Sequence, residues 1–123
     1  DKGVSHVFCD GAPVEVVKHE FTLSLAPLKE QKGLGAMDVA KGLLDKGYMA
    51  PTVYFPLIVP ECMMIEPTET ESKEVLDEFA KKFVEVLQEE ADVLHNAPVT
   101  TKVRRVDEVY AARNLTLSYP FDE

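Results

Sequence analysis

Residues 62–83, CMMIEPTETESKEVLDEFAKKF, change from a short apolar run into a charged stretch in which apolar residues recur every three or four positions. A short apolar run that ends near a proline is typical of a strand, and apolar spacings of three and four place side chains on one face of a helix. We therefore predict a strand over 61–66 and one long helix over 70–95. The apolar face of that helix comprises Leu76, Phe79, Phe83, Leu87 and Ala91, broadened by Val86 and Leu94.

The acidic junction between these two elements, IEPTETESKE (65–74), has two interpretations. If the junction starts a helix, the hydroxyl of Thr68 or Thr70 would accept a hydrogen bond from an unpaired backbone N–H of the first turn. Thr68 with Glu71 also fits a capping box. The glutamates would also lie near the positive end of the helix dipole. As a metal loop, the junction would need further ligands that converge on it, and the sequence contains no second cluster of Asp, Glu and His. We predict a helix start and no metal site.

Runs rich in β-branched and aromatic residues predict further strands. These runs cover residues 4–9, 14–25 and 52–57, with a further short strand indicated at 115–119. A second helix is predicted over 34–46, because its apolar residues share one face, namely Met37, Ala40 and Leu44 with Val39 and Leu43 beside them. Gly47 suits the left-handed residue that ends many helices, and 27–33 is predicted to be a loop. The order is β-α-β-β-α, followed by the short strand. Each helix has a single apolar face, so both should cover one side of a small, mostly antiparallel sheet in the α+β class.

Composition limits the class of protein and its partners. A chain of 123 residues with 46% hydrophobic and 28% charged residues has the size and balance of one globular domain. The net charge of −9 argues against nucleic acid, since phosphate binding depends on clustered Lys and Arg. The one basic cluster, KVRR at 102–105, is expected to be a solvated segment. The chain starts at Asp1 without an initiator Met, so we expect a piece of a longer protein.

The cysteines and the hydropathy indicate the compartment. Cys9 and Cys62 show no metal-binding spacing and are expected to be buried free thiols in a reducing cytosol. The most apolar stretch, 53–65, is interrupted by Pro56 and Pro60 and cannot form a membrane helix. We therefore expect a cytoplasmic protein with no membrane partner.

His19 and Glu20 are the one adjacent pair that could carry acid–base chemistry. Neighbours within a strand point to opposite faces of the sheet, so a structural histidine is favoured unless one face lines a cleft. The serines lack the flanking glycines of a nucleophile elbow. Gly33-Leu34-Gly35 alone is too weak a pattern for a phosphate-binding loop.

Three stretches carry a resemblance to a known family. They are HEFTLSLAPLK (19–29), DVAKGLLDKGYMAPTVYFPLIVPECMMIEPTETESKEVLDEF (38–79) and NAPVTTKVRRVDEVYAAR (96–113). They resemble the C-terminal part of glycine dehydrogenase (decarboxylating), the P-protein of the glycine cleavage system. YFPLIVPE and NAPVTTKVRRVDE are most similar to subunit 2 of the two-subunit bacterial form. The resemblance runs from about Lys18 to Arg113.

The resemblance implies an enzyme that uses pyridoxal phosphate (PLP) and has the aspartate-aminotransferase fold type. Its large domain holds the cofactor on a lysine in a Ser/His-Lys context, which no lysine here clearly has. The full enzyme decarboxylates glycine and passes the aminomethyl group to the lipoyl arm of the H-protein, with P-protein subunit 1 and the large domain as further partners. Residues 1–123 would be the single C-terminal small domain of that subunit, with 99–123 as a partly irregular tail. By itself it should bind no PLP and be inactive.

The resemblance also directs attention to one set of residues. It implies that the acidic junction and the pair His19 and Glu20 face the cleft between the small and large domains. It assigns no catalytic role to any of these residues. The cleft candidates are His19, Glu20, Glu66, Thr68, Glu69 and Thr70. Ala26-Pro27 stands where single-chain relatives have Arg-Pro, so no substrate-binding arginine is expected there. The alternative interpretation is a free-standing ferredoxin-like ligand-binding module without catalysis, which shares the order of elements.

Overall fold

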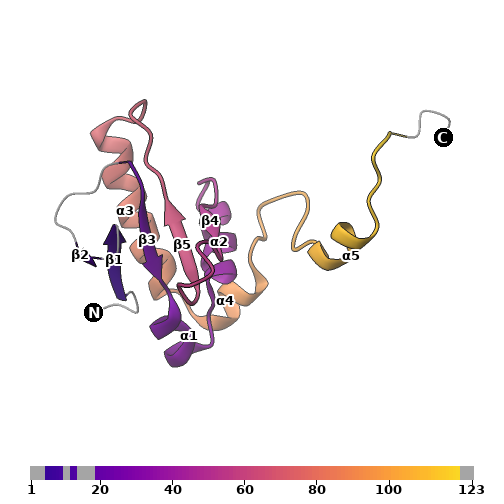
Figure 1. The fold of residues 1–123 in the computed structure, drawn as a ribbon, viewed down its shortest axis with the longest axis horizontal. Coiled ribbons are helices and arrows are strands. Elements are labelled where there is room, and N and C mark those ends of the chain that lie inside the picture. The colour runs from indigo at the N-terminus through magenta and orange to yellow at the C-terminus, as the bar shows by residue number, and fades with distance from the viewer. Residues whose placement is uncertain (1–4, 10–11, 14–18, 120–123) are drawn as a thin grey trace.

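The computed structural model of this chain describes residues 5–9, 12–13 and 19–119, and side chains from residue 19 onward. Its centre is a five-stranded antiparallel sheet with the strand order β2-β1-β3-β5-β4 (Figure 1). The strands are β1 (Ser5–Cys9), β2 (Ala12–Pro13), β3 (Phe21–Ser24), β4 (Thr52–Val53) and β5 (Cys62–Ile65). The predicted α+β fold with a mostly antiparallel sheet is confirmed. Of the strand predicted over 14–25, residues 14–18 lie outside the described residues.

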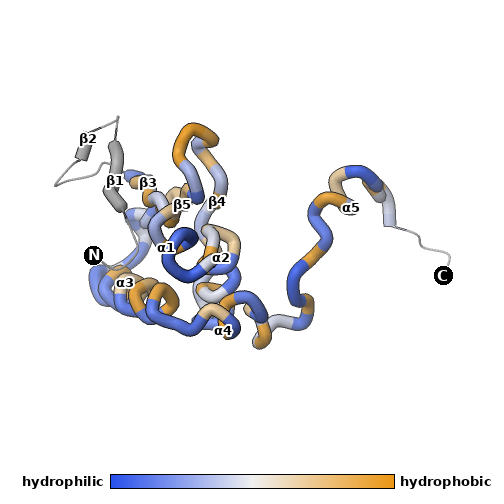
Figure 2. The backbone as a smooth tube through the Cα atoms, turned by 90° about the horizontal axis from the view of Figure 1, so that it is seen from below, coloured by the Kyte–Doolittle hydropathy of each residue, from blue (hydrophilic) through white to orange (hydrophobic). Residues whose placement is uncertain are grey.

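Helices cover one face of this sheet. They are α2 (Ala36–Asp45), α3 (Lys73–Gln88) and α4 (Ala91–Asn96). In the register of β3 and β5, Phe21 lies opposite Ile65 and Leu23 opposite Met63, so these four side chains share a face. Leu23, Met63 and Ile65 are buried in one core together with the apolar stripes of α2 and α3. Figure 2 shows α3 and α4 on one side of the strands, as expected for helices with a single apolar face.

The opposite face of the sheet is more open. Thr22 and Thr52 both lie opposite Met64, and these side chains alternate with the buried ones. Beyond this face the apolar loop, which we define as residues 54–59 between β4 and β5, rises on the side away from α3 (Figure 2). Its Leu57 and Ile58 are 88% and 89% exposed. An exposed apolar loop beside an open sheet face is typical of a surface that another protein segment covers.

The base of the apolar loop is anchored by Cys62. This thiol is free and buried, as predicted, and donates a hydrogen bond to the carbonyl of Phe55 at 2.8 Å. Burial raises the pKa of the Cys62 thiol. A thiol held in this way has a packing role rather than a reactive one.

The prediction of one helix over 70–95 is wrong at Glu89 and Glu90, which separate α3 from α4. Glu89 leaves the helix with φ −58° and ψ 155°. Its carboxylate pairs with Lys46 at 2.8 Å, and the ammonium of Lys32 donates to the carbonyls of Leu87 and Glu89, both at 3.2 Å. The two hydrogen bonds from Lys32 satisfy carbonyls at the end of α3, and the break allows Leu94 of α4 to pack on α2.

The predicted loop at 27–33 is also wrong, since Ala26–Lys32 forms the helix α1. Pro27 falls in its first turn, where a missing N–H costs nothing. Leu28 is buried, and Gly33 ends the helix with φ +72°, a conformation that favours glycine. One buried leucine in a polar stretch gave too weak a periodic signal for a helix prediction.

Past α4 the chain leaves the body of the domain. We call residues 99–119 the C-terminal arm; it carries the helix α5 (Glu108–Arg113) and extends well away from the sheet (Figure 1). The strand predicted at 115–119 is absent, because none of these five residues belongs to a strand. The partly irregular tail predicted for this region therefore contains a short helix instead.

Candidate functional site

The six cleft candidates fall on two segments at one end of the sheet. Because Phe21 pairs with Ile65, Glu20 and Glu66 leave the sheet at the same end. His19 and Glu20 precede β3 instead of lying within it, and His19 Nε2 is 3.8 Å from Glu20 Oε2. The prediction that these two side chains point to opposite faces is therefore wrong. The pair lies largely in contact with solvent, with side-chain exposures of 69% and 42%.

The other four candidates lie in the turn that leads from β5 to α3. Thr68 Oγ1 and Thr70 Oγ1 are 2.8 Å apart, and the N–H of Glu71 donates to the carbonyl of Thr68 at 3.1 Å. This closes a turn before the helix begins, so neither threonine caps α3 and that prediction is wrong. Ser72 is the N-cap, and its hydroxyl accepts the N–H of Val75 at 3.4 Å.

The turn helps to form a groove of about 560 Å³ between 47–52, the end of β5 and the first half of α3. Its walls are mainly apolar, and Tyr48 contacts Phe79 edge to face with ring centroids 5.4 Å apart. Glu66, Thr68 and Glu71 add carboxylates and a hydroxyl to its lining. Two of the six cleft candidates, Glu66 and Thr68, thus line the groove, whereas the other four do not.

The groove does not fit PLP. That cofactor needs a lysine amine of lowered pKa and donors for its phosphate. The residues that line the groove include no lysine, arginine or histidine, and their carboxylates would repel a phosphate. Elsewhere, hydrogen bonds from the ammonium groups to Glu61 and Glu85 raise the pKa values of Lys29 and Lys82.

Metal ions and membranes have no evident site in the part of the chain that the structure describes. Within residues 5–9, 12–13 and 19–119, no three side chains of His, Cys, Asp or Glu come together to hold a metal ion. The helices of the same ranges are too short or too polar to cross a bilayer.

A second polar cluster fixes the start of the arm, and sequence reasoning missed it. Asp45, at the end of α2, accepts the N–H of Val99 at 2.8 and 2.9 Å. It also accepts the N–H and the hydroxyl of Thr100 at 2.9 and 2.7 Å. Burial raises the pKa of Asp45, but these hydrogen bonds outweigh it and hold the pKa below the ordinary value of an aspartate.

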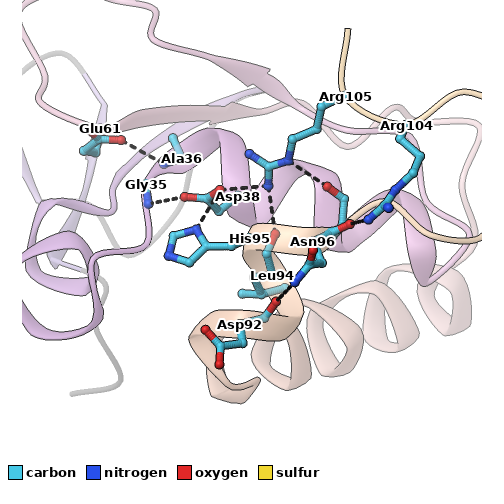
Figure 3. A network of polar contacts seen from close by, with 11 residues as sticks. Gly35, Ala36, Asp38, Glu61, Asp92, Leu94, His95, Asn96, Arg104 and Arg105 are labelled. Carbon is cyan, nitrogen blue, oxygen red and sulfur yellow. Dashed lines mark hydrogen bonds and ion pairs between the residues drawn. The ribbon is translucent and has the colours of Figure 1, made fainter.

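Two arginines complete this cluster, and Figure 3 shows them with their own partners. Arg105 donates to the carbonyls of Leu94 and Ala97 and to Asp38 Oδ1, each at 2.8 Å, and Arg104 donates to carbonyls just before the arm. We call Asp45, Arg104 and Arg105 the arm clamp. The expectation that KVRR is simply solvated is therefore wrong for its two arginines, whose partners are mostly carbonyls that no sequence pattern marks.

Comparison with known families identifies the chain. The sequence model of the family described as glycine dehydrogenase, C-terminal domain, matches residues 6–120. The chain belongs to this family. The match includes both segments of cleft candidates, the groove, the arm clamp and the described part of the arm. The resemblance found in the sequence is thus confirmed, and a free-standing ferredoxin-like module is not favoured.

Curated relatives carry the same family name. The chain is 54% identical over 110 residues to the probable glycine dehydrogenase (decarboxylating) subunit 2 of Nitrosospira multiformis. The aligned stretch covers 87% of the chain and 22% of that relative. The protein of that name from Thiobacillus denitrificans is 52% identical, over 87% of the chain and 23% of its own length. The one from Desulforamulus reducens is 57% identical, over 77% of the chain and 20% of its own length. The chain therefore spans about a fifth of the length of these relatives.

Proposed function

We propose that this chain is the C-terminal small domain of a longer, PLP-dependent glycine dehydrogenase (decarboxylating) subunit of the subunit 2 type. The family match over residues 6–120 carries this proposal. The proposed subunit works in the cytoplasm with P-protein subunit 1. Together they decarboxylate glycine and transfer the aminomethyl group to the lipoyl arm of the H-protein.

In this proposal PLP binds to the large domain, outside this chain. The groove argues for that division of labour, because its carboxylates and apolar walls do not suit a phosphorylated cofactor. The lysines whose pKa values are raised by ion pairs are likewise poorly suited to hold PLP covalently. The small domain on its own is expected to be inactive.

The chain would instead supply one wall of the cleft that holds glycine and admits the lipoyl arm. The six cleft candidates would face that cleft from the end of the sheet at which β3 begins and β5 ends. They are His19, Glu20, Glu66, Thr68, Glu69 and Thr70. The groove beside Glu66 and Thr68 and the apolar loop both offer apolar surface that a large domain could bury. Closing of such a wall on the large domain would exclude water from the reacting centre.

A chimeric subunit tests the proposal. In the Nitrosospira multiformis subunit 2, the matched stretch is replaced by this chain, and the product is combined with that organism's subunit 1 and lipoylated H-protein. We expect exchange of labelled bicarbonate with the glycine carboxyl, and borohydride should trap PLP on a lysine outside this chain. The same subunit truncated before the domain should be inactive.

Two results would overturn the proposal. One is an inactive chimera when the natural relative is active under the same conditions. The other is stoichiometric trapping of PLP on a lysine of this chain. For the cleft wall itself, Glu66→Gln should lower kcat/KM, whereas Glu78→Gln, which removes the same charge from an exposed position of α3, should not. Equal effects of the two changes would exclude a specific role of Glu66.

A further inference from the structure

The C-terminal arm displays apolar side chains along its whole length. They are Val99, Val103, Val106, Val109, Tyr110, Leu115, Leu117 and Tyr119, each more than half exposed. Single exposed apolar residues are ordinary, but a continuous series of them marks a surface that another protein segment covers. The helix α5 buries none of its own residues. The arm as described is therefore built to contact something other than the body of this domain.

The start of the arm, in contrast, is held firmly. The arm clamp joins the arm to α2 and α4 through the carboxylate of Asp45 and the guanidinium groups of Arg104 and Arg105. Charged groups that accept or donate several hydrogen bonds fix a geometry more strongly than neutral ones. The arm thus leaves the domain at a fixed place, which reduces the entropy lost when its far end binds.

The far end of the arm has the sequence pattern of a strand. In LTLSY, residues 115–119, apolar residues alternate with Thr116 and Ser118, which is the period of a strand with one apolar face. Leu115 and Leu117 are 71% and 90% exposed, and these five residues form no strand. A strand needs a neighbouring edge to pair with its backbone N–H and C=O groups. Residues 115–119 can therefore have a strand pattern without forming a strand here if the edge that they pair with belongs to another part of the protein.

The described strand edges of this domain are poor partners for a five-residue strand. The outer strands of the sheet are β2 and β4, each of two residues. Pro13 in β2 has no N–H to donate. After Val53 the chain turns away at Tyr54, whose φ is +60°. Pairing with a second copy of this sheet would therefore leave most of the backbone groups of 115–119 unsatisfied.

We propose that residues 115–119 become a strand by adding to an exposed sheet edge in the rest of the longer subunit, with Leu115 and Leu117 packed on that subunit's apolar surface. This inference rests on the proposed function. The family match extends to residue 120, so the arm belongs to the family's domain, while more than three quarters of the length of the relatives lies outside the match. A covalent link gives that part a high effective concentration near the arm. Strand addition is a common way to recognise extended segments.

Hydrogen exchange in the chimeric subunit tests the inference. The amides of 115–119 should exchange at least about 100-fold more slowly than in a free peptide of the same sequence, since paired edge amides open only by local unfolding. Successive N–H groups of a strand point to opposite edges. Thr116→Pro and Leu117→Pro should therefore differ clearly, with one abolishing protection of the neighbouring amides and the other largely retaining it. Leu117→Ser should lose protection, and Thr116→Ser should keep it.

The inference is overturned if these amides exchange at the rate of the free peptide, or if the two prolines act equally. Protection that requires subunit 1, or that rises with protein concentration together with a doubling of mass, would assign the edge to another chain and also overturn it. Bicarbonate–glycine exchange is measured on the same samples. An active chimera with an unprotected arm contradicts only the strand, whereas an inactive chimera with a protected arm contradicts only the proposed function.

Discussion

The carboxylate of Asp45 accepts the backbone N–H of Val99 with both of its oxygens, at 2.8 and 2.9 Å. Asp45 is the last residue of α2 and Val99 the first residue of the arm, so one side chain joins the helical layer to the segment that leaves it. The same carboxylate also binds the N–H and the hydroxyl of Thr100. The direction of the arm is thus set by a residue 54 positions earlier in the chain.

Asp45→Asn should loosen the start of the arm. An amide of the same shape keeps one acceptor oxygen but places an NH₂ group against backbone donors, so we expect a loss of about 1–2 kcal/mol in the free energy of unfolding. Amide exchange over 97–105 should accelerate, and urea unfolding gives the energy. Glu78→Gln is the matched loss of charge and should leave both unchanged. Unaltered exchange in Asp45→Asn would show that the arginines alone hold the arm.

The clamp should also weaken in acid. The pKa of Asp45 lies below that of an unfolded aspartate, about 3.9. Its contribution to stability is therefore complete above that pH and is lost as the pH falls through the folded pKa. The difference in unfolding free energy between the natural chain and Asp45→Asn should be constant from pH 7 to 5 and shrink toward pH 3. A difference that does not change with pH would contradict the charged hydrogen bonds.

Ser72→Ala should destabilise the start of α3, because Ser72 and not Thr68 is its N-cap. The 3.4 Å hydrogen bond to Val75 is long, so we expect a cost of about 0.5–1 kcal/mol, at the lower end for a cap. Thr68→Ala should cost less, and Ser72→Asn should retain stability since Asn caps equally well. Chemical denaturation of the three variants decides the matter. A larger loss in Thr68→Ala than in Ser72→Ala would restore the cap predicted from the sequence.

Local patterns predicted the elements that pack through their own regular faces. β5 follows from a short apolar run that ends near a proline, and α2 and most of α3 follow from spacings of three and four. Their apolar residues form the core. The break at Glu89 could not be predicted, because glutamate is a good helix former and the break depends on Lys32 and Lys46, far away in sequence. The strand signal at 115–119 is genuine as a pattern, but a strand forms only against a partner.

The candidate site was predictable to a similar extent. The acidic junction stood out by composition, and Glu66 and Thr68 do line a groove. The turn between Thr68 and Thr70 moved the helix start to Lys73, which the spacing of threonine and glutamate could not reveal. The arm clamp was missed because Arg105 and Asp38 are 67 residues apart. Contacts between distant charged groups and backbone carbonyls leave no periodic signal.

Phe83→Ala and Phe79→Ala should differ in their effect on stability. Phe83 is 8% exposed within the core, so its truncation should cost about 3–5 kcal/mol. Phe79 is only half-buried, because its ring lies against Tyr48 in the wall of the groove, and its loss should cost roughly half as much. Urea unfolding of both variants is the measurement. Equal costs would mean that Phe79 is as deeply packed as the sequence stripe predicted.

The crossing of α2 with α3 and α4 depends on Gly42. A methyl group there would lie 2.6 Å from Leu94 Cδ2 and 2.9 Å from Val86 Cγ1, which is too close for carbon atoms. Gly42→Ala would gain about 0.5–1 kcal/mol of helix propensity, but overpacking costs about 1–3 kcal/mol. Val86 is β-branched and has few alternative rotamers, so the helices themselves must separate. We expect a net loss of stability.

A double mutant separates this packing effect from backbone effects. Leu94→Ala alone should cost about 2–5 kcal/mol by leaving a cavity. In the double mutant Gly42→Ala with Leu94→Ala, the new methyl group fills part of that space. The double mutant should therefore lose less unfolding free energy than the sum of the losses in the two single mutants, by about 0.5–3 kcal/mol. Denaturant unfolding of all four proteins gives this coupling energy. Strict additivity, or a stabilised Gly42→Ala, would show that α4 moves away at little cost and that the close approach at Gly42 does not determine how α4 packs.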